Sequence, residues 1–271
     1  MIGRSVGFGF ATARDAIARG LVRLHVTPNT LSLIGAALTC GAGVCYALGA
    51  GADGTLLRAG AWSVDAAGGA GFLLPAGLLL VLASACDMLD GAVARIGTSK
   101  TAFGGFLDST LDRLSDFAVY AGIAIGFARR EPANLTFCLL AMVAVANAYM
   151  ISYTKARAED FIDTCSVGFW QRGERSTAVL IGTFAGHVPA LMIQQALLPA
   201  LTVWRRVRHT QLTLRARAGR PVRPLPGWLD MLRLWRAPRM TVSYDLVVAV
   251  NIAWLLLADL PATDVLRTWW T

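Results

Sequence analysis

The stretch CDMLDGAVARIGTSKTAFGGFLDSTLDRLSD, residues 86–116, places five aspartates in a chain that is otherwise strongly apolar. Asp87 and Asp90 are spaced i, i+3, and Asp108 and Asp112 are spaced i, i+4. On two helices, each pair therefore presents both carboxylates on one face. Because two such helices can pack side by side, the stretch predicts a helical pair with four converging carboxylates.

The composition around this stretch indicates an all-α, polytopic membrane protein. Of the 271 residues, 55% are hydrophobic and 15% are charged, whereas a soluble domain carries about 25% charged residues. The net charge of +8 comes mainly from arginines between apolar runs. Such clusters are typical of cytoplasmic loops in contact with anionic lipids, so we expect membrane lipids and no nucleic acid as partners. The five cysteines show no CxxC spacing, and we expect no disulfides.

Helix breakers and apolar runs divide the chain into segments. An amphipathic stretch up to residue 25 suits a helix lying in the headgroup plane. Pro28 then ends it, and a first span starts near residue 30. Further spans are expected at about 72–91, about 104–128 and about 134–156, each close to the length that a bilayer core requires. The chain thus divides into an N-terminal amphipathic interfacial helix, a transmembrane core, a basic cytoplasmic segment and a C-terminal hydrophobic segment, at residues 1–25, 26–209, 210–240 and 241–271.

Residues 176–204 could form one long helix or a hairpin of two short helices. With a cytoplasmic N-terminus, a single helix would export residues 205–239, which hold ten arginines and one aspartate. This violates the positive-inside tendency, so the hairpin is favoured. Residues 176–187 are too short to cross a full hydrocarbon core, which requires an earlier start or burial in protein. The apolar residues 241–259 then predict an additional C-terminal membrane helix.

Four carboxylates at membrane depth require neutralisation, and divalent cations provide it. Hard oxygen ligands favour Mg²⁺ or Mn²⁺ over zinc. Gly91 leaves room beside the acids for a phosphate group, and Arg95 offers a planar donor fork for a phosphate oxygen. The competing interpretation is that the acids cap helices or form ion pairs with Arg95 and Arg113.

The full string fits the pattern D-x2-D-G-x2-A-R-x8-G-x3-D-x3-D and resembles the signature of the CDP-alcohol phosphotransferase family. The positions that fill the signature are Asp87, Asp90, Gly91, Ala94, Arg95, Gly104, Asp108 and Asp112. The resemblance extends from TPNTLSLIG to about residue 209. It implies six core transmembrane helices, usually in a homodimer, in the cell (inner) membrane with the active site facing the cytoplasm.

The resemblance also implies roles for single residues. The family's two-metal centre maps onto Asp87, Asp90, Asp108 and Asp112, and its general base maps onto Asp112. The positions that contact CDP-diacylglycerol map onto Asn29, Thr30, Leu31, Ser32, Gly91, Arg95 and Thr101. In such a site an alcohol attacks the lipid-side phosphorus and CMP leaves. Asp116 lies outside the signature, and a structural ion pair is the favoured role for it.

The acceptor alcohol is predicted from the basic residues after the fourth span. SYTKARAED and GFWQRGER carry Lys155, Arg172 and Arg175, which would form an anion pocket beside the metals. These strings are similar to those of phosphatidylinositol-phosphate synthases, which implies inositol phosphate as the acceptor. Glycerol 3-phosphate is the alternative, because it also needs cationic partners. Arg157 fits a plain cytoplasmic loop equally well.

Two other classes of function compete with this hypothesis. A transporter could use an acidic intramembrane cluster as an ion path, but it would not need the Gly-Ala-Arg elements at these spacings. A catalytically inactive scaffold is disfavoured because every signature position is filled.

Overall fold

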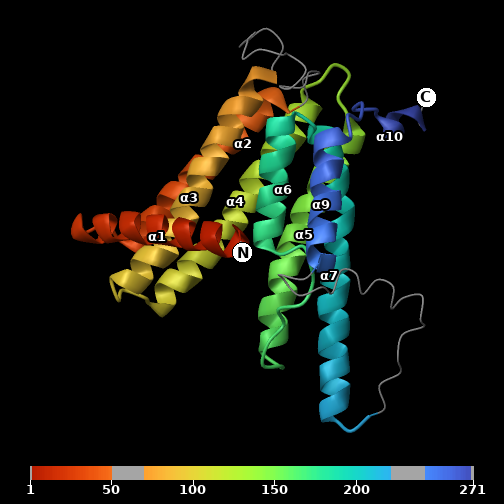
Figure 1. Cartoon of the computed structure of the whole chain (residues 1–271). Coiled ribbons are helices and arrows are strands. Elements are labelled where there is room, and N and C mark those ends of the chain that lie inside the picture. Colours follow the sequence, from red (N-terminus) through yellow and green to blue (C-terminus); the bar gives the residue numbers. More distant parts are fainter. Residues whose placement is uncertain (1, 51–69, 221–241, 270–271) are drawn as a thin grey trace.

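The computed structural model describes residues 2–50, 70–220 and 242–269, and within these ranges it contains helices and no strands (Figure 1). The predicted all-α class is therefore confirmed. The elements in chain order are α1 (Ile2–Arg23), α2 (Pro28–Gly49), the 3-10 helix η2 (Ala70–Phe72), α3 (Leu73–Ile96), α4 (Ala102–Ala128), α5 (Leu135–Glu159), α6 (Arg172–Ala185), α7 (Val188–Arg217), α9 (Val242–Leu257) and α10 (Val265–Thr268).

Helix α1 lies across the other helices, as Figure 1 shows. It packs against α3, where Ala18 is buried in a small apolar cluster with Leu31 and Val93. After α1 the chain turns, and Thr27 caps α2 by accepting a hydrogen bond from the Thr30 amide at 3.2 Å. The proline at the first position of α2 is compatible with this start because that position has no intrahelical N–H partner.

Three helices, α2, α3 and α5, are long and apolar enough to cross a membrane. Helix α2 packs against both α3 and α4. In the contact with α4, the two backbones approach each other closely at Gly43 and Gly122. A Cβ on Gly122 would collide with the carbonyl oxygen of Gly43. Small residues allow helix backbones to approach closely in membranes. All four spans predicted before residue 160 exist as helices.

Residues 172–217 form a hairpin of α6 and α7, so the predicted hairpin is confirmed and the single long helix is wrong. The second helix is not short as predicted, because α7 has 30 residues and continues to Arg217. Gly186 ends α6 in the left-handed region with φ 75°, where glycine lacks the penalty that a Cβ brings. Pro189 then lies in the first turn of α7. Helix α6 has 14 residues and packs between α3 and α9 as well as against α7, which meets the requirement that a short helix be buried in protein.

The C-terminal helices pack onto the core. Helix α9 lies against α6 and α7, and α10 lies against α5. Helix α9, with 16 residues, lies where the additional C-terminal membrane helix is predicted. The predicted basic segment 210–240 is described up to residue 220, within and just after α7, and its remainder lies outside the described residues.

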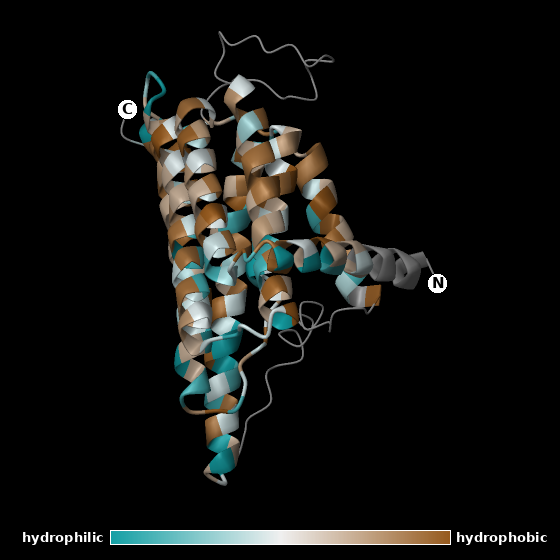
Figure 2. Ribbon diagram, turned by 90° about the vertical axis from the view of Figure 1, so that its left-hand side faces the viewer, coloured by the Kyte–Doolittle hydropathy of each residue, from teal (hydrophilic) through white to brown (hydrophobic). Residues whose placement is uncertain are grey.

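Apolar and polar residues separate along the bundle axis. Figure 2 shows hydrophobic residues along the upper part of the helices and hydrophilic residues toward the lower end. Helix α1 lies at the height where the two zones meet. This distribution fits an integral membrane protein with α1 at an interface.

Candidate active site

The acidic motif folds into one cluster. Helices α3 and α4 are joined by a short turn, and Thr101 starts α4 by accepting a hydrogen bond from the Gly104 amide at 2.9 Å. The turn brings the end of α3 against the start of α4. Carboxylate oxygens of Asp87, Asp90 and Asp108 lie within 4.8 Å of one another. This donor set of hard oxygens fits a divalent cation such as Mg²⁺ or Mn²⁺.

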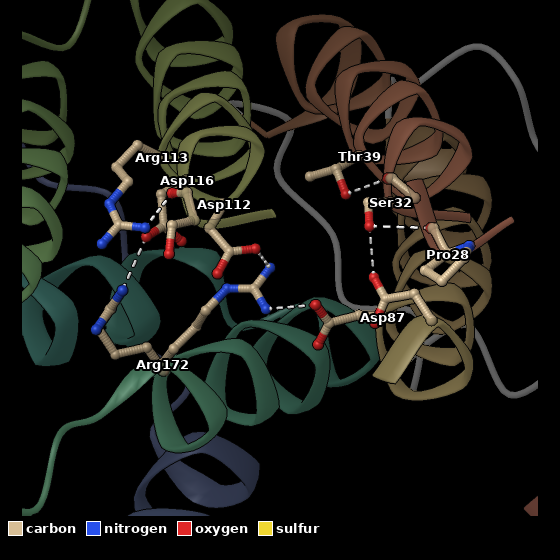
Figure 3. A network of polar contacts seen from close by, with 12 residues as sticks. Pro28, Ser32, Thr39, Asp87, Asp112, Arg113, Asp116 and Arg172 are labelled. Atoms are coloured by element: carbon tan, nitrogen blue, oxygen red, sulfur yellow. Dashed lines mark hydrogen bonds and ion pairs between the residues drawn. The ribbon is translucent and has the colours of Figure 1, made fainter. Parts of the chain in front are cut away.

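Arg172, at the start of α6, lies between two of the predicted metal ligands (Figure 3). Its Nη1 is 2.8 Å from Asp87 Oδ1, and its Nη2 is 2.7 Å from Asp112 Oδ1. The competing interpretation named Arg95 and Arg113 as ion-pair partners of the acids, whereas the partner in these two contacts is Arg172. Arg113 instead donates to the carbonyl oxygen of Ser109. One guanidinium therefore offsets part of the negative charge of the cluster.

The four signature aspartates all line one small cavity. Its volume is about 30 Å³, and Ser32 and Arg172 also line it. The structure thus brings together the four predicted metal ligands, with Asp112 turned toward Arg172.

The segment Asn29–Ser32 reaches the acids from α2. Ser32 Oγ donates to Asp90 Oδ2 at 2.7 Å (Figure 3), and Asp90 is 9% exposed. Asn29 lies beside α4, because a Cβ on Gly104 would be 3.1 Å from Asn29 Oδ1. Leu31 is buried and Thr30 is exposed. The predicted CDP-lipid segment therefore adjoins the predicted metal ligands.

Three further predicted nucleotide contacts surround this cluster. A Cβ on Gly91 would meet Arg95 Nη1 at the ordinary distance of 3.5 Å, so packing within the protein does not require glycine there. Arg95 is exposed, as is Thr101. Packing leaves the side chains of Arg95 and Thr101 accessible to a ligand.

Arg175 lies one turn beyond Arg172 and is 2% exposed. Its Nη2 is 2.8 Å from Asp116 Oδ2, so the predicted structural pairing of Asp116 is present. Its Nε and Nη1 are buried without a hydrogen-bond partner among the described residues. Arg172 and Arg175 both line a cavity of about 310 Å³ that also includes Asp87. Asp116 lines it too, so the cavity beside the acidic cluster is lined by two arginines and two aspartates, and each of these arginines is ion-paired with an aspartate.

Lys155, which was predicted to bind the acceptor, does not reach this cavity. It lies near the end of α5 and lines neither of the two cavities among the described residues. Two further residues of the larger cavity, Ser115 and Tyr120, were not predicted as site residues. Their spacing from Asp112, at three and eight residues, places them near the same face of α4 and could have indicated them.

Apolar helices with a carboxylate cluster suited to divalent cations define an integral membrane protein with a candidate metal centre. A family model described as CDP-alcohol phosphatidyltransferase matches residues 25–210. The chain therefore belongs to the CDP-alcohol phosphatidyltransferase family, whose members are enzymes.

Several relatives carry more specific names. The chain is 33% identical to archaetidylinositol phosphate synthase of Pyrococcus horikoshii over 201 residues, covering 74% of this chain and 92% of that protein. It is 43% identical to the Methanothermobacter thermautotrophicus enzyme of the same name over 118 residues, covering 44% of this chain and 57% of that protein. Phosphatidylinositol phosphate synthase of Corynebacterium glutamicum is 31% identical over 168 residues, covering 62% of this chain and 67% of that protein.

Solved structures of a relative show the same fold. The crystal structure of Mycobacterium tuberculosis phosphatidylinositol phosphate synthase with CDP-DAG bound superimposes with a TM-score of 0.59 at 26% identity, covering 73% of this chain and 92% of that chain. A second structure of that enzyme, in complex with manganese and citrate, has the same TM-score at 27% identity, covering 73% of this chain and 88% of that chain. The manganese complex and the aspartate cluster together indicate that this chain uses a divalent metal.

Proposed function

We propose that this protein transfers the phosphatidyl group of CDP-diacylglycerol to inositol phosphate, with release of CMP. The observation that carries the proposal is that two arginines line a cavity directly beside the carboxylate cluster. The carboxylates of Asp87, Asp90 and Asp108 lie within 4.8 Å of one another, and Arg172 and Arg175 line the adjoining cavity. The acids suit a cation-bound diphosphate, and the arginines suit an anionic acceptor.

The acidic side would hold the CDP-lipid. Asp87, Asp90, Asp108 and Asp112 would bind two Mg²⁺ or Mn²⁺ ions. When bound, such ions offset the charge of a diphosphate and stabilise attacking and departing oxygens. The segment 29–32 would cover the nucleotide, with Gly91, Arg95 and Thr101 along the diphosphate.

The basic side would hold the acceptor. A phosphomonoester carries almost two negative charges at neutral pH and would be repelled by the aspartates unless nearby cations offset that charge. Arg172 and Arg175 are such cations in this cavity, and the Nε and Nη1 atoms of Arg175 make no hydrogen bond within the described residues. We retain Lys155 as a third contact, which requires its side chain to swing toward the cavity when the acceptor binds.

Asp112 is proposed to act as the general base. Its carboxylate would take the proton of the acceptor hydroxyl as that oxygen forms its bond to the lipid-side phosphorus. The bond from this phosphorus to the CMP oxygen breaks, and CMP leaves. Arg172 contacts Asp112 at 2.7 Å and therefore orients the carboxylate.

An acceptor panel tests the function. Purified protein, CDP-diacylglycerol and Mg²⁺ are combined with inositol phosphate, glycerol 3-phosphate, free inositol or serine, and CMP release is measured. We expect release with inositol phosphate and little with the uncharged polyol. Equal rates with inositol and inositol phosphate would contradict a phosphate pocket, and preference for glycerol 3-phosphate would replace the proposed acceptor.

We also propose a topology. Helices α2 to α7 would form six core spans and α9 an additional one, with α1, the acids and the end of α7 on the cytoplasmic side of the cell membrane. The arginines near the end of α7, such as Arg215, favour that side. The protein would act as a homodimer, which chemical cross-linking in membranes tests. A cysteine engineered at position 215 should resist labelling from outside intact cells, and its labelling would overturn the topology.

A further inference from the structure

Helix α9 lies outside residues 25–210, the range that the family model matches, yet it contacts the helix that carries Arg172 and Arg175. The hydroxyl of Tyr244 donates a hydrogen bond to Glu174 Oε1 at 2.9 Å. The Tyr244 ring also packs against Phe169, just before α6, with ring centroids 5.4 Å apart. Tyr244 thus contacts both the segment just before α6 and the first turn of α6.

The first turn of α6 is held from two opposite sides. Arg172 and Arg175 are three residues apart and therefore share a face, which forms ion pairs with aspartates of α3 and α4. Glu174 lies about 200° around the helix from Arg172, since each residue advances by about 100°. It therefore faces α9. The hydrogen bond from Tyr244 restrains the rotation of the turn that sets the direction of both arginines.

Local sequence does little to fix this turn. Gln171, the N-cap residue, makes no side-chain capping hydrogen bond. Gly173 lies within the first turn, and glycine is among the weakest helix formers. A helix start without a cap and with a glycine depends on tertiary contacts for its orientation.

Helix α9 is itself anchored firmly enough to act as a support. Gln194 Nε2 donates to Asn251 Oδ1 at 2.9 Å, and Trp254 Nε1 donates to the carbonyl oxygen of Ala190 at 3.1 Å. The chain after α9 is also attached, because Asp264 Oδ1 accepts a hydrogen bond from Thr136 Oγ1 at 2.7 Å. These contacts connect α9 to α7 and the following segment to α5.

We propose that α9 is a positioning element of the active site and that Tyr244, through Glu174, holds Arg172 and Arg175 in the orientation that binds the acceptor phosphate. The inference rests on the proposed function, because it assigns the arginines to the acceptor. Tyr244 touches no reacting group and is a positioning residue.

The test compares Tyr244→Phe with wild type in the CMP-release assay. The variant keeps the ring contact with Phe169 and loses the hydroxyl. We expect the KM for inositol phosphate to rise about three- to tenfold, the scale of one hydrogen bond. The KM for CDP-diacylglycerol and the melting temperature in detergent should stay unchanged. In a Glu174→Ala background, Tyr244→Phe should have no further effect on the acceptor KM, because the partner is already absent.

Trp254→Phe is the matched control, since it removes one hydrogen bond between α9 and α7, away from the arginines. Its acceptor KM should equal that of wild type. An unchanged acceptor KM in Tyr244→Phe would overturn the proposal. An equal rise in the KM values for inositol phosphate and CDP-diacylglycerol would also overturn it, as would the same rise of the acceptor KM in Trp254→Phe. Either result would indicate a general loss of helix packing rather than a specific effect on the arginines. The wild-type acceptor panel tests the proposed function separately, and if glycerol 3-phosphate is the substrate, the same comparison with its KM still decides the role of Tyr244.

Discussion

The ion pair between Arg175 and Asp116 allows a quantitative prediction about stability. The two side chains are 3% and 18% exposed, and the distance between Nη2 and Oδ2 is 2.8 Å. Removing one partner of such a buried pair leaves the other charge without compensation, which costs about 3–5 kcal/mol. We therefore expect Arg175→Met and Asp116→Leu each to reduce the free energy of unfolding by about this amount.

The double variant should behave differently. Replacement of both charges by apolar side chains of similar volume is often neutral for stability, so Arg175→Met with Asp116→Leu should lie within about 1–2 kcal/mol of wild type. The resulting coupling energy is about 4 kcal/mol or more, because the effects of contacting residues do not add. Unfolding in mixed detergent micelles, followed by circular dichroism, measures all four proteins.

Two results would refute this reasoning. Single variants that each lose less than about 1 kcal/mol, and whose effects add, would mean that the pair is solvated rather than buried. A double variant as unstable as the singles would mean that packing, not charge, controls this position. The double variant also separates the structural role of Arg175 from its role in acceptor binding. A folded protein without Arg175 should still show a raised KM for the acceptor and an unchanged KM for CDP-diacylglycerol.

Three further predictions concern the acids and the helix packing. Asp87→Asn and Asp108→Asn should abolish CMP release and weaken Mn²⁺ binding, measured by titration calorimetry, while circular dichroism stays unchanged; near-normal turnover would contradict metal ligation. Asp112→Asn should lower kcat by about 10²- to 10⁴-fold, and a loss confined to the KM for CDP-diacylglycerol would leave it as a ligand alone. Gly122→Ala should cost about 1–3 kcal/mol of stability because its Cβ meets backbone of α2. Gly20→Ala, whose Cβ meets nothing within 4 Å, should be at least as stable as wild type, because alanine is the better helix former.

The helices themselves could be predicted from local sequence. Apolar runs of bilayer length indicated α2 to α5, and Pro28 indicated the start of α2. Charge distribution correctly favoured the α6–α7 hairpin over one long helix, because a hairpin keeps the following arginines on the same side of the membrane as the start of α6. The end of α6 at Gly186 follows from a backbone conformation that glycine adopts readily.

The aspartates were also predictable, since helical spacing alone places each pair on one face. Their cationic partners were not. Asp87 and Arg172 are 85 residues apart in the chain, and the competing ion-pair interpretation named only the nearer Arg95 and Arg113. Ion-pair choice depends on which helix packs against α3 and α4, and no local pattern carries that information.

The sequence by itself determined the membrane class, the helices and the acidic motif, because hydrophobic length, helical period and helix breakers act over a few turns of chain. Only the tertiary structure decided that Arg172 lies between Asp87 and Asp112, that Arg175 is committed to Asp116, and that Tyr244 reaches Glu174. These contacts join helices far apart in the chain. Their geometry is fixed by how the helices pack together, and a few ångströms of helix displacement would break each of them.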